Sequence, residues 1–329
     1  MGTWGTGLYA GDFAADLRGA ISAVARLPFE PDRLVDILCD YEPGAARESA
    51  DPDHPTFWLV LADQFAKRGI VSPRVRDTTL SLIDSGADLA MMASRGMAPA
   101  GLRVRGRVLA ELRERLIAPT SAKPRTVLKA PQPFLLEVGD VIVFPTSRGD
   151  VINPYFKSRE AIPNWRHDGW GAFVVAERGR AFDFFAWYRP LVSWATTAKP
   201  DFAALITRQN WVLKRAGALR RLHIQRMAFE AVGNLAIDAA KFHTLFPGRP
   251  SGVSDAVGDL SIANRLFLEV EDAPKPNYQP NRVIPTVHAL GDIMAISRPM
   301  DPRDLRPGMT VDGGIGEGLF LARDGGGVR

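Results

Sequence analysis

The sequence predicts an α+β protein, in which an N-terminal helical domain precedes a β-rich, small-barrel-like domain with helical insertions. Apolar residues recur every three or four positions up to about residue 118, as they do on one face of a helix. Beyond about residue 131, short runs of β-branched and aromatic residues lie between turn signals, which is typical of strands. A length of 329 residues with 46% hydrophobic content suits two domains that each bury a core.

The segment between these regions is rich in proline and small polar residues. It begins PTSAKP, and it predicts a linker over residues 119–130. The expected domains are therefore 1–118, which is helical, and 131–329, which is β-rich. Each should fold around its own core.

Five helices are expected in the first domain. Asp12 is predicted to cap the first, and Ser72 with Pro73 provides a cap and first turn for the fourth. The third helix is apolar nearly all round, which predicts a central position. Cys39 lies on an apolar helix face, where a buried hydrophobic role is expected. The expected helices run from Asp12 to about Arg26, from about Pro31 to Tyr41, from Pro55 to Gly69, from Pro73 to Gly86, and over 99–117.

The second domain should begin with three strands. They are expected at 135–145, 171–176 and 180–188, with a tight turn at 177–180. Phe182 and Phe184 are expected in the barrel core. Helical insertions are predicted around 200–210 and 230–245.

A Gly-Asp turn that leads into a short apolar strand recurs in this domain. The pattern occurs at 138–144 and at 290–296, with a partial copy at 257–260. The repetition is compatible with a duplicated domain. It leaves open whether the second half forms one barrel or two.

The chain opens with the glycine-rich stretch MGTWGTG. A phosphate loop is excluded, because no strand precedes the stretch and no Gly-Lys-Ser or Gly-Lys-Thr follows it. The stretch formally fits a myristoylation pattern. A structural role is favoured, because glycines allow close backbone approach and an indole buries a large apolar area. Gly2, Trp4, Gly5 and Gly7 are therefore expected to form an N-terminal plug packed on the third helix.

The sequence contains no catalytic or metal-binding motif. None of the five histidines is spaced as a metal-ligand pair, and one cysteine provides no thiolate cluster. Asp12 and Asp16 lie one turn apart and could bind a cation, although stabilisation of a helix start explains them more simply. We therefore expect no catalytic residue, no metal and no cofactor. The chain has no membrane-length apolar run and no secretory signal, which predicts a cytoplasmic protein without a membrane partner.

Aromatic and charged residues are concentrated in the stretch NWRHDGWG at 164–171. Tryptophan, tyrosine and arginine are over-represented among the anchors of protein interfaces, so a recognition surface is one interpretation. A core role for the tryptophans is the other. His167 beside Asp168 could also form a proton-transfer pair, which is the basis of an enzyme hypothesis. The candidate partner-binding residues here are Trp165, Arg166, His167, Asp168 and Trp170.

Positive charge is concentrated just before the linker. Residues 96–129 carry eight basic and two acidic side chains, and Arg103, Arg105 and Arg107 occupy alternate positions. Steps of two distribute these arginines around a helix rather than along one stripe. They are candidate partner-binding residues. A basic helix over 103–115 that contacts nucleic-acid phosphates is the alternative hypothesis, against a simply solvated face.

Several blocks together resemble a known bacterial family. The opening MGTWGTG, DFAADL at 12–17, FWLVLADQF at 57–65 and an SPRV helix ending SGADL at 85–89 occur in the order seen in domain of unknown function 4259. The resemblance covers about residues 1–120. Relatives often have a tryptophan and a lysine where this chain has Phe65 and Lys67, so only the lysine matches. Through GDVIVFP, the β-rich half resembles immunity protein 26, a family from toxin–immunity loci.

These resemblances imply a function but no established activity. They imply a bacterial cytoplasmic protein that acts by protein–protein binding, with a cognate toxin as the expected partner. Nucleic-acid binding or sensing through the basic helix is the second hypothesis, and an enzyme centred on His167 and Asp168 is the third.

Overall fold

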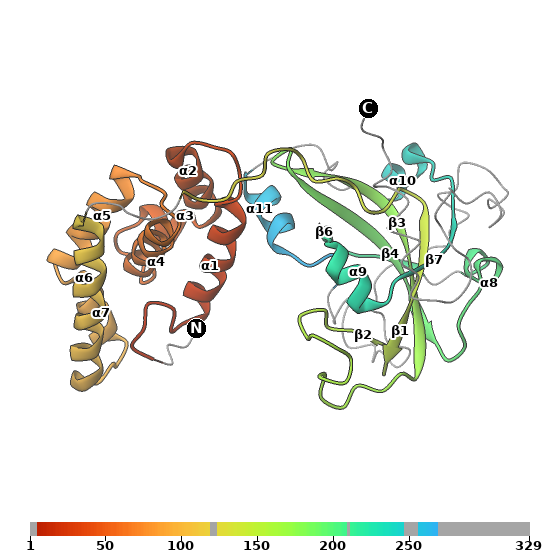
Figure 1. The fold of residues 1–329 in the computed structure, drawn as a ribbon, viewed down its shortest axis with the longest axis horizontal. Helices are drawn as coiled ribbons and strands as arrows, with labels where there is room; N and C mark the ends of the chain where they lie inside the picture. The colour runs from red at the N-terminus through yellow and green to blue at the C-terminus, as the bar shows by residue number, and fades with distance from the viewer. Residues whose placement is uncertain (1–4, 119–123, 209–210, 247–255, 269–329) are drawn as a thin grey trace. The chain divides into compact units, whose positions relative to one another are not determined.

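The computed structural model describes residues 5–118, 124–208, 211–246 and 256–268 (Figure 1). The chain divides into two compact units. The first, here called the helical unit, consists of Met1–Pro131, Phe182–Phe184 and Ser254–Asn264. The second, the sheet unit, consists of Gln132–Ala181, Phe185–Val253 and Arg265–Arg329. The fold is α+β, as the sequence predicts.

The helical unit is built around α4, which is buried along nearly its whole length, as expected of an all-round apolar helix. Short helices at 43–47 and 87–94 were not predicted, because proline and glycine signals obscured them. Cys39 is buried, as expected. The described helices of this unit are α1 (Asp12–Val24), α2 (Pro31–Tyr41), α3 (Pro43–Arg47), α4 (His54–Lys67), α5 (Pro73–Asp84), α6 (Ala87–Ser94), α7 (Pro99–Ile117) and α11 (Ala256–Asn264).

The helix ends follow the sequence signals with one correction. Ser72 caps α5 by accepting a hydrogen bond from the Val75 backbone N–H. Gly86 adopts a φ of 70° just beyond the end of that helix, which glycine permits without steric cost. The cap of α1 is Gly11 rather than Asp12. Asp12 instead lies in the first turn, where its charge complements the helix dipole.

The sheet unit contains one antiparallel sheet that forms a half-barrel. Its strand order is β2-β1-β3-β4-β5, while β6 pairs with β4 and β7 pairs with β1. The short helices α8 (Phe202–Ile206), α9 (Arg221–Met227) and α10 (Ala239–Leu245) belong to the same unit. The strands are β1 (Asp140–Ser147), β2 (Asp150–Val151), β3 (Gly169–Ala181), β4 (Phe185–Thr196), β5 (Trp211–Leu213), β6 (Gly217–Ala218) and β7 (Glu230–Asn234).

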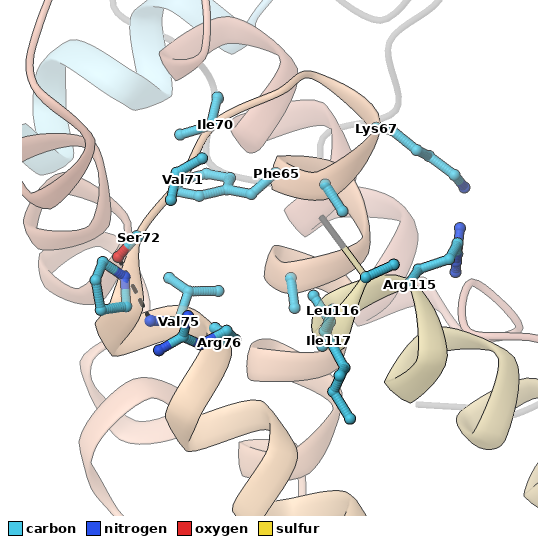
Figure 2. Close-up of a pocket in the computed structure, with 14 residues that line it drawn as sticks. Phe65, Lys67, Ile70, Val71, Ser72, Val75, Arg76, Arg115, Leu116 and Ile117 are labelled. Carbon is cyan, nitrogen blue, oxygen red and sulfur yellow. Dashed lines mark hydrogen bonds between the residues drawn. The ribbon is translucent and has the colours of Figure 1, made fainter. Parts of the chain in front are cut away.

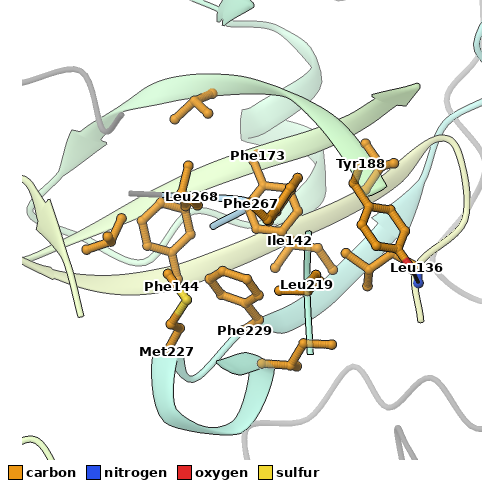
Figure 3. Close-up of a cluster of buried hydrophobic side chains, with 14 of the residues drawn as sticks. Leu136, Ile142, Phe144, Phe173, Tyr188, Leu219, Met227, Phe229, Phe267 and Leu268 are labelled. Atoms are coloured by element: carbon orange, nitrogen blue, oxygen red, sulfur yellow. Dashed lines mark hydrogen bonds between the residues drawn. The ribbon is translucent and has the colours of Figure 1, made fainter. Parts of the chain in front are cut away.

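Both faces of the sheet are covered, which explains why β1 is apolar without alternation. Ile142 and Phe144 enter one core, whereas Val141 and Val143 enter the other. Figure 3 shows the first core, in which the Phe173 ring lies 4.9 Å from Phe229 and 5.0 Å from Phe267 in edge-to-face contacts. Such contacts between rings add to the apolar burial.

The turn between β3 and β4 lies later than the sequence suggests. Residues 177–180 are part of β3, and a register shift at this point absorbs one extra residue. The chain reverses at 182–184, where both Phe182 and Asp183 have positive φ. The sequence gives no sign of this turn, because phenylalanine rarely adopts such a conformation.

Two further expectations are corrected. Phe182 and Phe184 do not enter the sheet cores. They meet the ring of Phe29 edge to face within the helical unit, with ring centroids 6.5 and 6.3 Å from that of Phe29. The predicted helical insertion at 230–245 is a strand, β7, followed by α10. The insertion near 200–210 corresponds to α8.

The first Gly-Asp turn has a clear structural basis. Gly139 has a φ of 88°, and a Cβ at this position would lie 1.8 Å from the carbonyl oxygen of Leu235, so only glycine fits. The Asp140 carboxylate accepts hydrogen bonds from the Glu137 N–H at 2.6 Å and the Asn234 amide at 2.8 Å. The partial copy at 257–260 lies in α11 and is helical. The copy at 290–296 lies outside the described residues.

Candidate functional site

The segment that holds the predicted recognition residues is fastened to the end of β1. The tight turn after this strand contains Arg148 and Gly149, both with positive φ. Both carboxylate oxygens of Asp168 accept from the Arg148 N–H at 2.8 Å, and the Asp168 N–H donates to the Thr146 carbonyl at 3.1 Å. The Arg166 N–H donates to the Ser147 hydroxyl at 3.1 Å. These bonds fix the backbone from which the aromatic side chains project.

Five side chains form a continuous array that we call the aromatic–cation ladder. The Trp165 and His167 rings are parallel, with an interplanar angle of 9° and centroids 6.4 Å apart. His167 meets Trp170 edge to face at 5.0 Å. The Arg159 guanidinium lies 5.8 Å from the Trp165 centroid, and the Lys199 ammonium lies 5.2 Å from that of Trp170. Three neighbouring aromatic rings thus have one cation at each end of the row.

The ladder lies at the surface of the sheet unit. His167 and Lys199 are exposed, whereas Trp165 and Trp170 are half-buried. Trp170 also packs against the second core of the sheet, so the alternative of a core role holds in part for this tryptophan. Lys199 also forms an ion pair with Glu230 at 2.6 Å. The buried indole N–H of Trp165 has no acceptor among the described residues. An unsatisfied buried donor costs about 1–3 kcal/mol of stability.

His167 and Asp168 do not form the proton-transfer pair that the enzyme hypothesis requires. The Asp168 carboxylate is engaged by the backbone of Arg148, and the imidazole of His167 packs between two indoles. Among the residues that the structure describes, no group of three or more histidine, cysteine, aspartate or glutamate side chains could hold a metal ion.

The three alternate arginines of α7 fall into two environments. Arg103 and Arg107 are exposed. Arg105 is only 2% exposed, and it forms a two-pronged ion pair with the buried carboxylate of Asp88, with both N–O distances at 2.8 Å. It also donates to the Gly7 carbonyl at 2.6 Å. The expectation that Arg105 contacts a partner is therefore corrected, because its guanidinium is buried and hydrogen-bonded inside the helical unit.

The N-terminal segment is held by residues that follow the glycines. Leu8 packs with Leu59 of α4 and with leucines of α7, and Tyr9 bonds to α4. A Cβ on Gly7 would meet open space, so close packing does not explain this glycine. Gly5 is exposed. Gly2 and Trp4 lie outside the described residues, so the expected indole plug stays a prediction.

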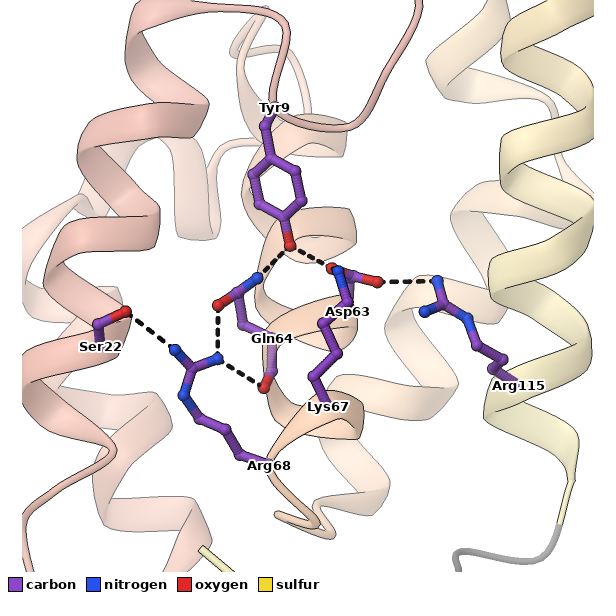
Figure 4. A network of polar contacts seen from close by, with 7 residues as sticks. All are labelled: Tyr9, Ser22, Asp63, Gln64, Lys67, Arg68 and Arg115. Carbon is purple, nitrogen blue, oxygen red and sulfur yellow. Dashed lines mark hydrogen bonds and ion pairs between the residues drawn. The ribbon is translucent and has the colours of Figure 1, made fainter. Parts of the chain in front are cut away.

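A polar network on α4 was not anticipated from the sequence (Figure 4). Asp63 is almost fully buried, and it binds Lys67 at 2.7 Å and Arg115 at 2.8 Å and accepts from the Tyr9 hydroxyl. Gln64 donates to the same hydroxyl. Asp63 lies within an apolar run, where periodicity alone predicts a core position and gives no sign of its charged partners.

The network shifts two pKa values in opposite directions. Burial, aided by the hydrogen bond to Asp63, raises the pKa of Tyr9 to about 12. Burial would raise the pKa of Asp63, but hydrogen bonds from Lys67 and Tyr9 and the nearby cationic charge outweigh it and lower the pKa. Asp63 is therefore a carboxylate, and Tyr9 a neutral donor, at neutral pH.

No protein-family model, curated protein or solved structure matches this chain. The resemblances to domain of unknown function 4259 and immunity protein 26 therefore stay predictions. Within the described residues, no helix combines the length and the apolar character that a membrane crossing needs.

Proposed function

We propose that the chain is a cytoplasmic, non-enzymatic bacterial protein that binds another protein, and that it neutralises a toxin in the manner of an immunity protein. The observation that supports this proposal is the aromatic–cation ladder at the surface of the sheet unit. Tryptophan and arginine are the side chains that most often dominate binding energies at interfaces. Arg159, the cation at the Trp165 end, would contact an acidic group of the partner. The charge of Lys199 is already paired with Glu230.

The ladder is arranged in advance of binding. The backbone of 166–168 is fixed by hydrogen bonds to the end of β1, and each ring already has an aromatic or cationic neighbour. Little side-chain entropy would then be lost on association, which favours affinity.

Nucleic-acid binding is the second candidate, and the same ladder gives it some support. Aromatic rings beside cations can stack on bases and contact phosphates. Against it, both tryptophans already carry a cation over the ring, so a base would have to displace an existing contact. Because Arg105 is buried, the exposed face of α7 also has fewer positive charges for phosphate contacts.

The decisive experiment is co-purification of the full chain with the product of the neighbouring gene at physiological salt. We expect a stable complex that is lost in Trp165→Ala and His167→Ala. His243→Ala and Tyr155→Ala, which alter exposed side chains outside the ladder, should leave it intact. Failure to recover the neighbour's product, or equal recovery by the ladder variants, would reject the proposal.

A second measurement separates the two candidates. Binding to single-stranded or duplex nucleic acid should be absent under the first proposal. Nucleic-acid binding that falls steeply between low and moderate salt would favour the second, because counterion release dominates such binding.

A further inference from the structure

A groove opens in the helical unit where the end of α4, the start of α5 and the end of α7 meet (Figure 2). Its volume is about 490 Å³, which is within the range of ligand-binding pockets. Phe65, Ile70 and Val75 form a buried apolar wall. Leu116 and Ile117 of α7 line the groove as well. The groove is remote in sequence from the aromatic–cation ladder, which belongs to the other unit.

Large apolar side chains are exposed at the rim of this groove. Val71 is 60% exposed and Ile117 is 55% exposed, which are among the highest values for large hydrophobic residues in the described chain. Both line the groove. Apolar groups that flank a hollow and remain in water are typical of a surface that another molecule covers.

The charged residues that line the groove all have the same sign. They are Lys67, Arg76 and Arg115, and none of the lining side chains is acidic. Lys67 and Arg115 share one buried carboxylate, that of Asp63, so the pair of cations retains an excess positive charge. Figure 2 shows both side chains on one side of the groove, with Arg76 on another.

The start of α5 also lies at the groove, where the Asp32 carboxylate already accepts from the Ser72 hydroxyl at 3.4 Å. Ser72 and Pro73 line the groove, and they lie at the N-terminal end of a helix of 12 residues. The partial positive charge of a helix N-terminus favours a nearby carboxylate. Arg76 is already paired with Asp77 at 2.8 Å. The apolar wall and the pair of Lys67 and Arg115 are therefore what call for an occupant with a bulky apolar side chain and adjacent acidic groups.

We propose that this groove is a docking site for an acidic peptide segment of a partner protein, which inserts an apolar side chain and places carboxylates beside Lys67 and Arg115. The exposed rim favours a peptide over a small molecule, because a ligand confined to the hollow would leave Val71 and Ile117 in water. This site is separate from the ladder, and it gives the helical unit a binding role of its own.

The test is selection of a display library of random linear peptides against the full chain, followed by fluorescence anisotropy of the enriched peptides after synthesis. Enriched sequences should combine a large apolar residue with glutamate or aspartate, and their affinity should fall as salt is raised. Ala66→Trp should block the groove, because Ala66 lines it and is only partly buried. Ala110→Trp, at an exposed position of α7 outside the groove, is the matched control.

Charge variants test the second half of the proposal. Arg115→Gln should weaken binding about tenfold, which corresponds to about 1.4 kcal/mol. Arg113→Gln on the same helix should have no effect, because Arg113 does not line the groove. Val71→Asp places a negative charge at an exposed position of the groove, where the fold should tolerate it. This charge repels the carboxylates of the peptide, so the variant should abolish binding.

Three results would overturn the proposal. The first is a selection that enriches no peptide, and the second is a set of enriched peptides without acidic residues. The third is binding of the peptides by the Ala66→Trp and Val71→Asp variants that equals their binding by the unchanged chain. The co-purification experiment with the ladder variants does not depend on the groove, and peptide binding to the groove does not depend on the ladder. Failure of the proposed function and failure of this inference can therefore be distinguished.

Discussion

Both units bury aromatic rings, but they differ in where they place ion pairs and in what they carry at the surface. The helical unit buries one complete ion pair, Arg105 with Asp88, and the carboxylate of Asp63, whose cations are about half exposed. The sheet unit buries rings, among them Phe144 and Phe173. It carries its aromatic–cation ladder at the surface.

The difference follows from how each unit satisfies its backbone. The paired strands of a sheet satisfy one another, so both cores of the sheet unit can be filled by apolar side chains. The segment before α1 is held by polar contacts to side chains of the helices. Its Gly7 carbonyl accepts from Arg105, and Tyr9 is bonded by α4. Buried charge in the helical unit thus anchors the N-terminal segment. Four predictions test this comparison, in order of decreasing effect.

Phe173→Ala should give the largest loss of stability. The ring is fully buried and contacts Phe144, Phe229 and Phe267, so we expect about 3–5 kcal/mol from lost burial and the cavity left behind. Urea unfolding monitored by tryptophan fluorescence, which is dominated by the sheet unit, measures this. Val71→Ala, at an exposed position, is the control. A loss below 1 kcal/mol would contradict the idea that rings hold this unit together.

Asp88→Asn should destabilise the helical unit by about 3 kcal/mol, because it leaves the buried guanidinium of Arg105 without a counter-charge. The double variant Asp88→Leu/Arg105→Met should recover much of this loss, since two apolar groups replace both charges. Arg113→Gln removes an exposed pair with Asp84 and should change stability by less than about 1 kcal/mol. Chemical denaturation followed by far-ultraviolet circular dichroism gives these values. Equal effects for the buried and exposed pairs would refute the comparison.

Asp63→Asn should have an intermediate effect of about 1–3 kcal/mol. The carboxylate is buried, but Lys67 and Arg115 are about half exposed and can be hydrated once it is lost.

The same network should make stability fall above pH 10. The folded pKa of Tyr9, about 12, exceeds its unfolded value of 10.0, so the stabilisation is complete below pH 10 and is lost as pH rises through 12. Tyr9→Phe should remove this alkaline component of the stability curve.

The smallest effect should come from His223 of α9, in the sheet unit. Burial, with the charges of Arg220 and Arg226, lowers its pKa below the ordinary 6.5. The folded state therefore binds fewer protons than the unfolded state, and stability is full above pH 6.5 and declines as pH falls through the folded pKa. The decline cannot exceed about 1.4 kcal/mol per pH unit for one proton. It should be absent in His223→Gln and unchanged in His243→Gln; thermal melts between pH 4 and 8 measure it.

Local patterns were good guides to the elements. The spacing of Leu109 and Leu112, the Ser72 cap and the glycine after α5 each correspond to the observed helices, because these features act within a few residues. The Gly-Asp motif at 139–140 likewise identified a true turn into a strand. The same letters at 257–260 form a helix, because the motif depends on the Leu235 carbonyl that lies against Gly139, and nothing within the motif specifies that contact.

The candidate sites were only partly visible. The clustering of Trp165, His167 and Trp170 in the sequence is close enough to indicate a surface, but Lys199 joins it only through the pairing of β3 with β4. The groove combines the end of α4 and the start of α5 with the end of α7 from residue 115 onward, so no local pattern could predict it.

The sequence by itself determined the five longer helices of the first unit and the first strands of the second, since apolar periodicity and caps are short-range properties. Tertiary structure alone decided which charges are buried. Of three arginines at alternate positions on α7, Arg105 meets Asp88 and the Gly7 carbonyl, while Arg103 and Arg107 meet solvent. The free energy of a charge depends on what surrounds it in space, and residues 17 and 98 positions away in the chain supply those surroundings.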